Sequence, residues 1–268
     1  TEGLVGSEMC IRDSLLTEKV HRIEKKDLFQ HIKKTIEKQF DTYTSELYEL
    51  ASRLDQLKRP VIIYIGGAPG TGKSMLATSL ATRLGINKVI STDSIREIMR
   101  LAFSNDLLPT LFHSTTEAWK GLPMEFQSSE QLIAGYCLQA NQVSLGVRAV
   151  VERTVEEGEN LIVEGAHLVP FLHEIAKKEM VDAYHIPITL SIMNEKHHRE
   201  RFSERGTKNL RKIENFYLER FDGIRSIHEY TLTQCETDEV EVFDNEDLDE
   251  TLNLIIQFSI QRLFKQVN

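Results

Sequence analysis

The sequence predicts an α/β protein with a three-layer fold, built on a five-stranded parallel sheet and preceded by a helical N-terminal appendage. Short apolar runs rich in β-branched residues alternate with stretches of helical period after residue 60. Such alternation is typical of parallel strands joined by right-handed helical crossovers. The length of 268 residues fits one large domain with a modest appendage.

Residues 1–59 are predicted to stand apart from that fold. Residues 1–14, TEGLVGSEMCIRDS, begin without Met and show neither the helical nor the strand period, so we expect a disordered, non-native leader. Residues 15–59 carry apolar side chains at helical spacing, which predicts two packed helices. The two stripes are Leu28, Ile32, Ile36 and Phe40, then Leu47, Leu50, Leu54 and Leu57.

The remaining residues, 60–268, contain the predicted sheet. Residues 61–65 are wholly apolar, as expected of a strand buried on both faces. Thr92 or Asp93 can cap the helix that follows the second strand. We expect the other strands at 88–90, 161–163, 186–192 and 239–243, helices at 73–85, 91–103 and 248–264, and a mostly helical insert at about 104–157.

The charge and composition of the chain indicate which kinds of molecule it binds. The net charge of -9 and the pI near 5.6 disfavour nucleic acid and anionic membranes, because both attract clustered Lys and Arg. The chain has no apolar run of 18 residues, the length that predicts a membrane-spanning helix. Cys10, Cys137 and Cys235 lie far apart, which indicates reduced thiols of a cytoplasmic protein. The expected partner is a small molecule, and the sequence leaves the oligomeric state open.

The strongest motif is GAPGTGKS at residues 67–74, which fits G-x-x-x-x-G-K-[ST] with a strand before it and a helix after it. Loops of this kind wrap the phosphates of ATP with backbone N–H groups. Lys73 is expected to bridge the β- and γ-phosphates and Ser74 to bind Mg²⁺. A plain glycine turn would need neither side chain. The predicted nucleotide-binding residues are Gly67, Ala68, Pro69, Gly70, Thr71, Gly72, Lys73, Ser74 and Met75.

A second motif, VISTDSIREIMR, places Asp93 at the end of the second strand, where ligands bind in open parallel sheets. A carboxylate there can take the proton of an attacking hydroxyl. Arg96 and Arg100 follow on one helical face and can bind an anionic acceptor. The alternative is an N-cap aspartate with two surface arginines.

A third motif, LIVEGAHLVP, ends an apolar strand with Glu164. An acid in this position can hold Mg²⁺ through water, and a helix cap or a salt-bridge partner is the alternative. His167 can face the acceptor or be a satisfied loop histidine.

Two further segments are candidate lids. The helix NEKHHRERFSERG brings together Arg199, Arg201 and Arg205; Arg199 and Arg205 are expected to close over the phosphates and neutralise the charge in transfer, unless the helix is merely solvated. The insert segment HSTTEAWKG offers His113, Ser114, Thr115 and Lys120 as acceptor ligands, and Trp119 as core or pocket wall.

Taken in order, these stretches resemble the 2-phosphoglycerate kinase family of archaea, over about residues 58–251. The resemblance implies the P-loop NTPase fold of nucleoside and small-molecule kinases, with the third strand between the second and the first. It also implies ATP-dependent phosphorylation of the 3-hydroxyl of 2-phosphoglycerate, giving 2,3-bisphosphoglycerate. Longer members carry an ATP-cone-like N-terminal domain, of which residues 15–59 can hold only part.

Three other functions are alternatives to a 2-phosphoglycerate kinase. The same motifs serve a P-loop kinase of another small anionic metabolite, such as a sugar acid or a phosphorylated polyol. A polynucleotide 5′-kinase would need a basic, aromatic-lined channel, which this acidic chain disfavours. A nucleotide-gated binding module without kinase activity would not need Asp93 together with an arginine-rich lid.

Overall fold

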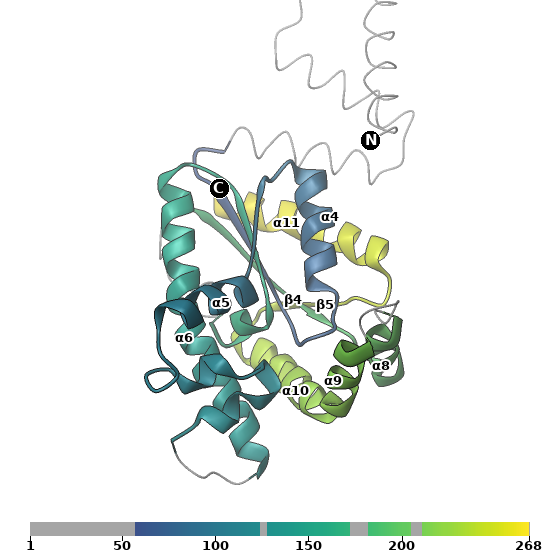
Figure 1. Cartoon of the computed structure of the whole chain (residues 1–268). Coiled ribbons are helices and arrows are strands. Elements are labelled where there is room, and N and C mark those ends of the chain that lie inside the picture. The colour runs from purple at the N-terminus through teal and green to yellow at the C-terminus, as the bar shows by residue number, and fades with distance from the viewer. Residues whose placement is uncertain (1–56, 124–127, 172–181, 205–210, 268) are drawn as a thin grey trace, which may run out of the picture. The chain divides into compact units, whose positions relative to one another are not determined.

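The computed structural model of the chain describes residues 57–123, 128–171, 182–204 and 211–267 (Figure 1). They belong to the second of two units into which the chain divides, Thr1–Gln56 and Leu57–Asn268. The predicted leader at 1–14 and the two predicted N-terminal helices, down to residue 56, lie outside the described residues.

A parallel sheet runs through the described part of the chain. Its strands pair in the order β2-β3-β1-β4-β5, and all four pairings are parallel. This confirms the predicted five-stranded sheet and the position of the third strand between the second and the first. The strands are β1 (Val61–Gly66), β2 (Lys88–Ser91), β3 (Leu161–Glu164), β4 (Tyr184–Ser191) and β5 (Glu241–Asp244).

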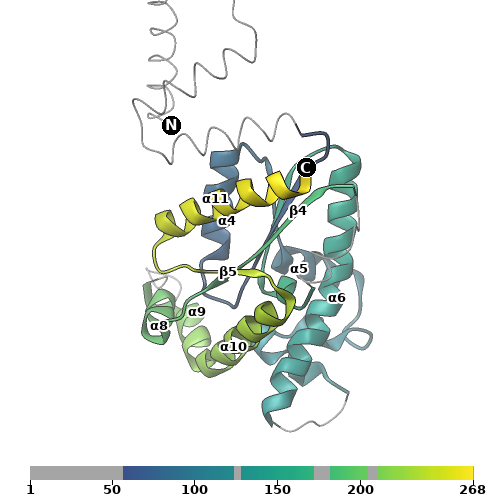
Figure 2. The same ribbon diagram turned by 180° about the vertical axis from the view of Figure 1, so that it is seen from behind.

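Helices cover both faces of the sheet, which confirms the three-layer fold. Figures 1 and 2 show α4 (Lys73–Leu84) and α11 (Leu248–Val267) on one side and α6 (Ser128–Glu156) on the other. No helix among the described residues combines the length and apolarity needed to cross a bilayer. The remaining helices are α5 (Thr92–Ala102), η1 (Pro109–Phe112), η2 (Thr115–Gly121), η3 (Ala166–Phe171), α8 (Glu195–Glu204), α9 (Arg211–Glu219) and α10 (Phe221–Asp238).

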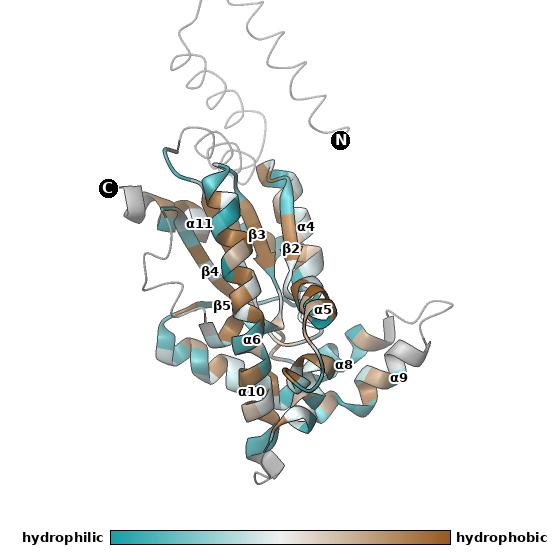
Figure 3. Ribbon diagram, turned by 60° about the vertical axis from the view of Figure 1, so that its left-hand side comes forward, coloured by the Kyte–Doolittle hydropathy of each residue, from teal (hydrophilic) through white to brown (hydrophobic). Residues whose placement is uncertain are grey.

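A hydrophobic core lies between the sheet and α6. Ile62 and Tyr64 of β1 alternate with residues that face the other layer, and they pack with Val143 and Val147 of α6. Strands that are apolar on both sides produce this arrangement, and Figure 3 shows β3 and β4 as hydrophobic along most of their length. The buried strands thereby fix where their polar carboxyl ends emerge.

Two local predictions differ from the structure. The N-cap of α5 is Ser91, whose Oγ accepts from the Ser94 N–H at 3.0 Å, and not Thr92 or Asp93. The helix can start there because Ser91 ends β2 with extended backbone, which leaves the Asp93 carboxylate free of capping. Residues 236–250 include nine acids, which predicts a solvated loop around an edge strand. This segment is a loop only in part, since α10 ends at Asp238 and α11 begins at Leu248. In the part of the chain that is described, no group of acids, His or Cys there or elsewhere could hold a metal ion on its own.

Gly165, directly after β3, is the tightest point between β3 and α5. Its φ is +150°, and a Cβ there would lie 1.8 Å from Thr92 Oγ1. We expect Gly165→Ala to lower the free energy of unfolding by about 2 kcal/mol, since both the backbone and the neighbour must shift. Denaturant unfolding measures the change.

Gly158→Ala is the matched control, because Gly158 also has a positive φ, +70°, but nothing within 4 Å of its Cβ position. Gly158→Ala should lower the free energy of unfolding only by the cost of holding an alanine at a positive φ, about 1 kcal/mol. Equal losses in the two variants would contradict the close-approach argument.

Candidate functional site

The loop between β1 and α4 is shaped by three glycines with positive φ, at Gly67, Gly70 and Gly72. Gly72 is also the N-cap of α4, and no side chain caps the helix there. The first N–H groups of α4 are therefore left for a ligand, and the helix dipole favours an anion at this end. This is the geometry expected of a phosphate-binding loop.

Three side chains donate to carbonyls of that loop, and two of them come from distant parts of the chain. Lys73 Nζ donates to the Ala68 carbonyl at 2.7 Å, His198 Nε2 to the Pro69 carbonyl at 2.8 Å, and Asn245 Nδ2 to the Thr71 carbonyl at 2.8 Å. Because these carbonyls face donors, the alternating N–H groups are free to face the inner side. His198 and Asn245 were not anticipated from the sequence, since they lie more than 120 residues along the chain.

Ser74 and Glu164 are a pair of oxygen-bearing side chains that lie next to each other in the site. Strand β3 pairs with β1 so that Glu164 lies beside Ile65, and the Ser74 hydroxyl donates to Glu164 Oε1 at 2.9 Å. Glu164 is 6% exposed. Burial raises the pKa of its carboxyl, although the Lys73 ammonium and the Ser74 hydroxyl act in the opposite direction. A hydroxyl and a carboxylate with this spacing fit Mg²⁺, which prefers oxygen ligands.

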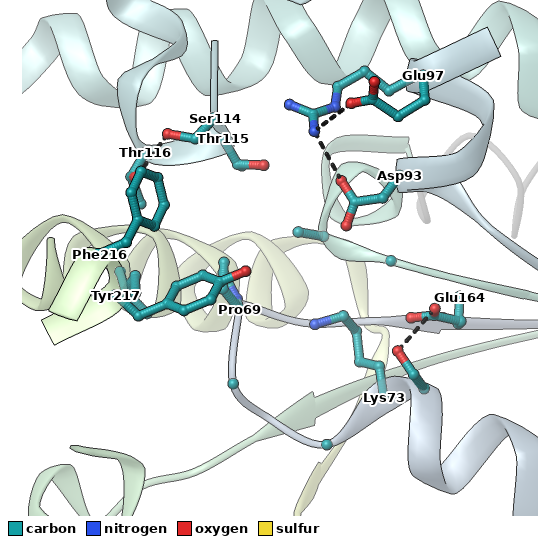
Figure 4. A pocket seen from close by; sticks show the side chains of 17 residues that line it. Pro69, Lys73, Asp93, Glu97, Ser114, Thr115, Thr116, Glu164, Phe216 and Tyr217 are labelled. Carbon is teal, nitrogen blue, oxygen red and sulfur yellow. Dashed lines mark hydrogen bonds and ion pairs between the residues drawn. The ribbon is translucent and has the colours of Figure 1, made fainter. Parts of the chain in front are cut away.

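A pocket of about 430 Å³ opens in front of this pair (Figure 4). Figure 4 shows Lys73 and Glu164 on one side of it, Asp93 on a second side, and the hydroxyl and aromatic side chains opposite. The lining residues are Pro69, Gly70, Gly72, Lys73, Ser74, Asp93, Arg96, Glu97, Ser114, Thr115, Thr116, Glu164, Gly165, Ala166, Phe216, Tyr217 and Ile224.

Asp93 and Arg96 extend from the first turns of α5 into the pocket. The Asp93 carboxylate is 66% exposed and lies 3.7 Å from Arg96 Nη2, whereas the Arg96 side chain is only 14% exposed. Arg96 Nη1 donates to the His113 carbonyl at 2.6 Å, and Nη2 donates to Glu97 Oε1 at 3.2 Å. Arg96 is thus held in place while Asp93 remains open to a ligand.

Several predicted acceptor ligands have local partners and do not line the pocket. Arg100 donates to both Glu97 carboxylate oxygens at 2.8 and 2.9 Å. Lys120 donates to Glu117 at 2.7 Å. His113 contributes its carbonyl to Arg96, and Trp119, 37% exposed, is neither core nor pocket wall. Both cations thus pair with an acid three residues before them in the chain.

His167 is in the interior and connects α5 to the insert. Gln139 Nε2 donates to the Thr110 and His113 carbonyls at 2.6 and 3.0 Å, so its Oε1 faces His167 and accepts from Nε2 at 3.1 Å. Nδ1 then accepts from the Thr92 hydroxyl at 2.8 Å. Burial lowers the pKa of His167 to about 4. A neutral histidine therefore holds the segment that carries the pocket hydroxyls.

The predicted lid helix α8 carries Arg199 and Arg201 among its described residues. Arg199 is exposed, with its guanidinium 4.2 Å from the ring centre of Phe221. Arg201 Nη2 donates to the Asn245 and Glu246 carbonyls, and its Nη1 is 3.2 Å from the Cβ position of Gly72. Arg201 is therefore the arginine beside the phosphate-binding loop. Arg205 lies outside the described residues.

Sequence reasoning missed the aromatic wall of the pocket. Phe216 and Tyr217 of α9 and Ile224 of α10 line it, and Tyr217 stacks on Phe202 with ring centres 5.0 Å apart. The segment NFYLERF carries several closely spaced aromatics, a signal that a search for charged and glycine-rich motifs passes over.

The buried Glu164 carboxylate generates a stability prediction. Its pKa is raised on folding, so the wild-type protein loses stability as pH rises from the ordinary value of 4.5 through the folded value. Glutamine has no proton to lose. Glu164→Gln should therefore raise the free energy of unfolding of the nucleotide-free protein more at about pH 8 than at pH 4.5, as measured by denaturant unfolding.

Glu157→Gln is the control of opposite sign. The hydrogen bond from Lys88 lowers the pKa of Glu157, so the ionised carboxylate stabilises the wild-type protein more as pH rises. The free energy of unfolding of Glu157→Gln should therefore fall relative to that of the wild type as pH rises. A Glu164→Gln effect that does not grow with pH would contradict the desolvation argument.

Several known proteins are similar to this chain over most of its length. A family model described as an AAA domain matches residues 63–222. A 2-phosphoglycerate kinase from Methanopyrus kandleri is 36% identical over 95% of this chain and 77% of its own, and one from Pyrococcus furiosus is 39% identical over 84% and 72%. Among solved structures, a gluconokinase from Sinorhizobium meliloti is similar at 13% identity and a TM-score of 0.47, over 79% of this chain and all of that one.

The two archaeal enzymes match 95% and 84% of the chain, and the matched domain spans the loop, Asp93, Glu164 and the predicted lid helix α8. This confirms the resemblance predicted from the motifs. The chain belongs to the 2-phosphoglycerate kinase family.

Proposed function

We propose that this chain transfers the γ-phosphoryl group of ATP to the 3-hydroxyl of 2-phosphoglycerate, giving ADP and 2,3-bisphosphoglycerate. The relatives at 33–39% identity bear the name of that kinase. The observation that carries the proposal is the single pocket in which Lys73, Ser74 and Glu164 face Asp93 and Arg96. Groups for a nucleotide phosphate and groups for a hydroxyl acceptor thus share one space.

The nucleotide side of the mechanism uses the loop and α4. Backbone N–H groups of residues 67–74 bind the β-phosphate, and Lys73 reaches the γ-phosphate once it leaves the Ala68 carbonyl. Ser74 and Glu164 would hold Mg²⁺, which neutralises phosphate charge when bound. These fixed dipoles and charges stabilise the transferring group more than the ground state.

The acceptor side uses α5 and the insert. Asp93 accepts the proton of the 3-hydroxyl while that oxygen forms its bond to the γ-phosphorus and the bond to ADP breaks. Lys73 and Arg96 are the cationic side chains among the pocket-lining residues, against the acids Asp93, Glu97 and Glu164. Among the described residues, Arg96 is therefore the proposed ligand of the acceptor phosphate, with the hydroxyls of Ser114, Thr115 and Thr116 as further donors.

The arginines of α8 are proposed to complete the charge balance. Arg201 already lies beside Gly72, and Arg199 and Arg205 keep their predicted role over the transition state. Closure of such a helix excludes water from the reaction. The cytoplasmic location and the absence of nucleic-acid partners stay predictions of the sequence.

ADP release coupled to NADH oxidation tests the proposal, with ATP, Mg²⁺ and 2-phosphoglycerate, 3-phosphoglycerate, glycerate or no acceptor in parallel. Acceptor-dependent release with 2-phosphoglycerate is the expected result. ADP release with another of these acceptors instead would show that the protein is a kinase with a different acceptor. Background release with all of them, despite ATP binding, would favour the nucleotide-gated module.

Asp93→Asn removes the proposed base and keeps its shape. We expect kcat to fall by at least about a hundredfold, the usual contribution of general acid–base catalysis. The KM for ATP should stay close to wild type, because Asp93 lies on the acceptor side.

Asp106→Asn is the matched control, since Asp106 is an exposed aspartate outside the pocket. It should leave both constants unchanged. Near wild-type turnover of Asp93→Asn at saturating acceptor would sink the base assignment.

A further inference from the structure

Two walls of the acceptor side of the pocket come from distant parts of the chain. Ser114, Thr115 and Thr116 belong to the start of η2, and Phe216 and Tyr217 belong to the end of α9. Figure 4 shows the hydroxyl side chains next to Phe216, across the pocket from Lys73. An acceptor bound at Arg96 needs both walls at a defined spacing.

Glu117 of η2 connects to both walls. Its Oε2 accepts from the hydroxyl of Ser114 at 3.1 Å, and its Oε1 accepts from Arg220 Nη2 at 3.0 Å and from Lys120 Nζ at 2.7 Å. The Glu117 side chain is 20% exposed. Arg220 first, and then Lys120, hold the pKa of this carboxyl down at about 2. The carboxylate is therefore ionised throughout the range in which a kinase works.

Arg220 lies at the junction of α9 and α10, and it holds Phe216 in two ways. Its Nη1 donates to the Phe216 carbonyl at 3.1 Å, and its guanidinium lies 3.8 Å from the centre of the Phe216 ring. The planar guanidinium can stack on a ring and bind a carboxylate at the same time, which a lysine ammonium cannot. The position of Phe216 is thus tied to that of Glu117, 103 residues away from Arg220 in the chain.

We infer that Glu117 and Arg220 are positioning residues, an ion pair that sets the spacing between the hydroxyl wall and the aromatic wall of the acceptor pocket. The inference rests on the proposed function only in calling that side of the pocket the acceptor side. Neither residue lines the pocket, so each acts through a neighbour: Glu117 through Ser114, and Arg220 through Phe216.

The pair should affect the acceptor more than the nucleotide. Its contacts end at Ser114 and Phe216, and neither of these is a residue of the phosphate-binding loop. An acceptor hydroxyl displaced by about 1 Å can lose a hundredfold in rate. Loss of either partner should therefore lower kcat/KM for the acceptor and leave the KM for ATP near its wild-type value.

Steady-state kinetics of Glu117→Gln, Arg220→Met and the double variant test this, each with acceptor and ATP varied in turn. We expect kcat/KM for 2-phosphoglycerate to fall about tenfold to a hundredfold in each single variant, with less than about a twofold change in the KM for ATP. Because the two residues act as one unit, the double variant should be no worse than the worse single variant. Additive losses, or equal effects on ATP and acceptor, would overturn the inference.

Glu219→Gln is the matched control on the arginine side. Glu219 Oε2 also lies near Arg220, at 3.5 Å from Nη1, but its side chain is 72% exposed and belongs to the same helix end. Removing that charge leaves the link between the walls intact, so the acceptor kinetics should stay at the wild-type value. If kcat/KM for the acceptor falls as much in Glu219→Gln as in Glu117→Gln, the effect comes from the charge near Arg220. The link between the two walls would then not be its cause.

Trp119, the single tryptophan of the chain, separates this inference from the proposed function. It lies two residues after Glu117 in η2 and is 37% exposed, so acrylamide quenching of its fluorescence reports on η2 without any turnover. More quenching in Glu117→Gln and Arg220→Met, but not in Glu219→Gln, supports the inference even if 2-phosphoglycerate proves inert. Unchanged quenching in both variants would overturn it, whatever the wild-type protein phosphorylates.

Discussion

The parallel pairing of β3 with both β1 and β2 is the constraint on which the site depends. Glu164 lies in register with Ile65 on one side and with Ser91 on the other. The residues that follow β1 form the phosphate-binding loop, and those that follow β2 begin α5 with Asp93. Since parallel strands end at one edge, one backbone register brings together the loop, the acid proposed to bind Mg²⁺ and the proposed base.

Around that edge, the loop and α5 are each held from behind. The carbonyls of Pro69 and Thr71 accept from His198 and Asn245, which come from α8 and the end of β5. The first turn of α5 is joined to η3 through the hydrogen bond between Thr92 and His167, and His167 is joined in turn to Gln139 of the insert. These supports lie outside the pocket and leave its inner surface to ligands, so that binding groups are preorganised rather than assembled at each turnover.

The strands and the phosphate-binding residues could be predicted because local sequence determines them. A wholly apolar 61–65 has to be buried, and glycines at 67, 70 and 72 adopt φ values that other residues rarely reach. The acceptor side could not be predicted in the same way. Arg100 and Lys120 have the right charge at helical spacing, yet a nearby acid occupies each. Phe216 and Tyr217 reach the pocket only through the packing of α9, and the cluster of aromatics around them in the sequence does not show which surface they line.

Buried histidines show how polar groups support this site without adding charge. His167, His198 and His228 are at most 2% exposed, and burial lowers the pKa of each to about 4. A neutral imidazole has one donor and one acceptor on opposite sides. His198 donates to Pro69 and accepts from Arg225 at 3.3 Å, so a second proton would face a guanidinium. The charged groups of the pocket at neutral pH are therefore Lys73, Arg96 and the acids. Among these, the exposed Asp93 is the group placed to take a proton from an acceptor.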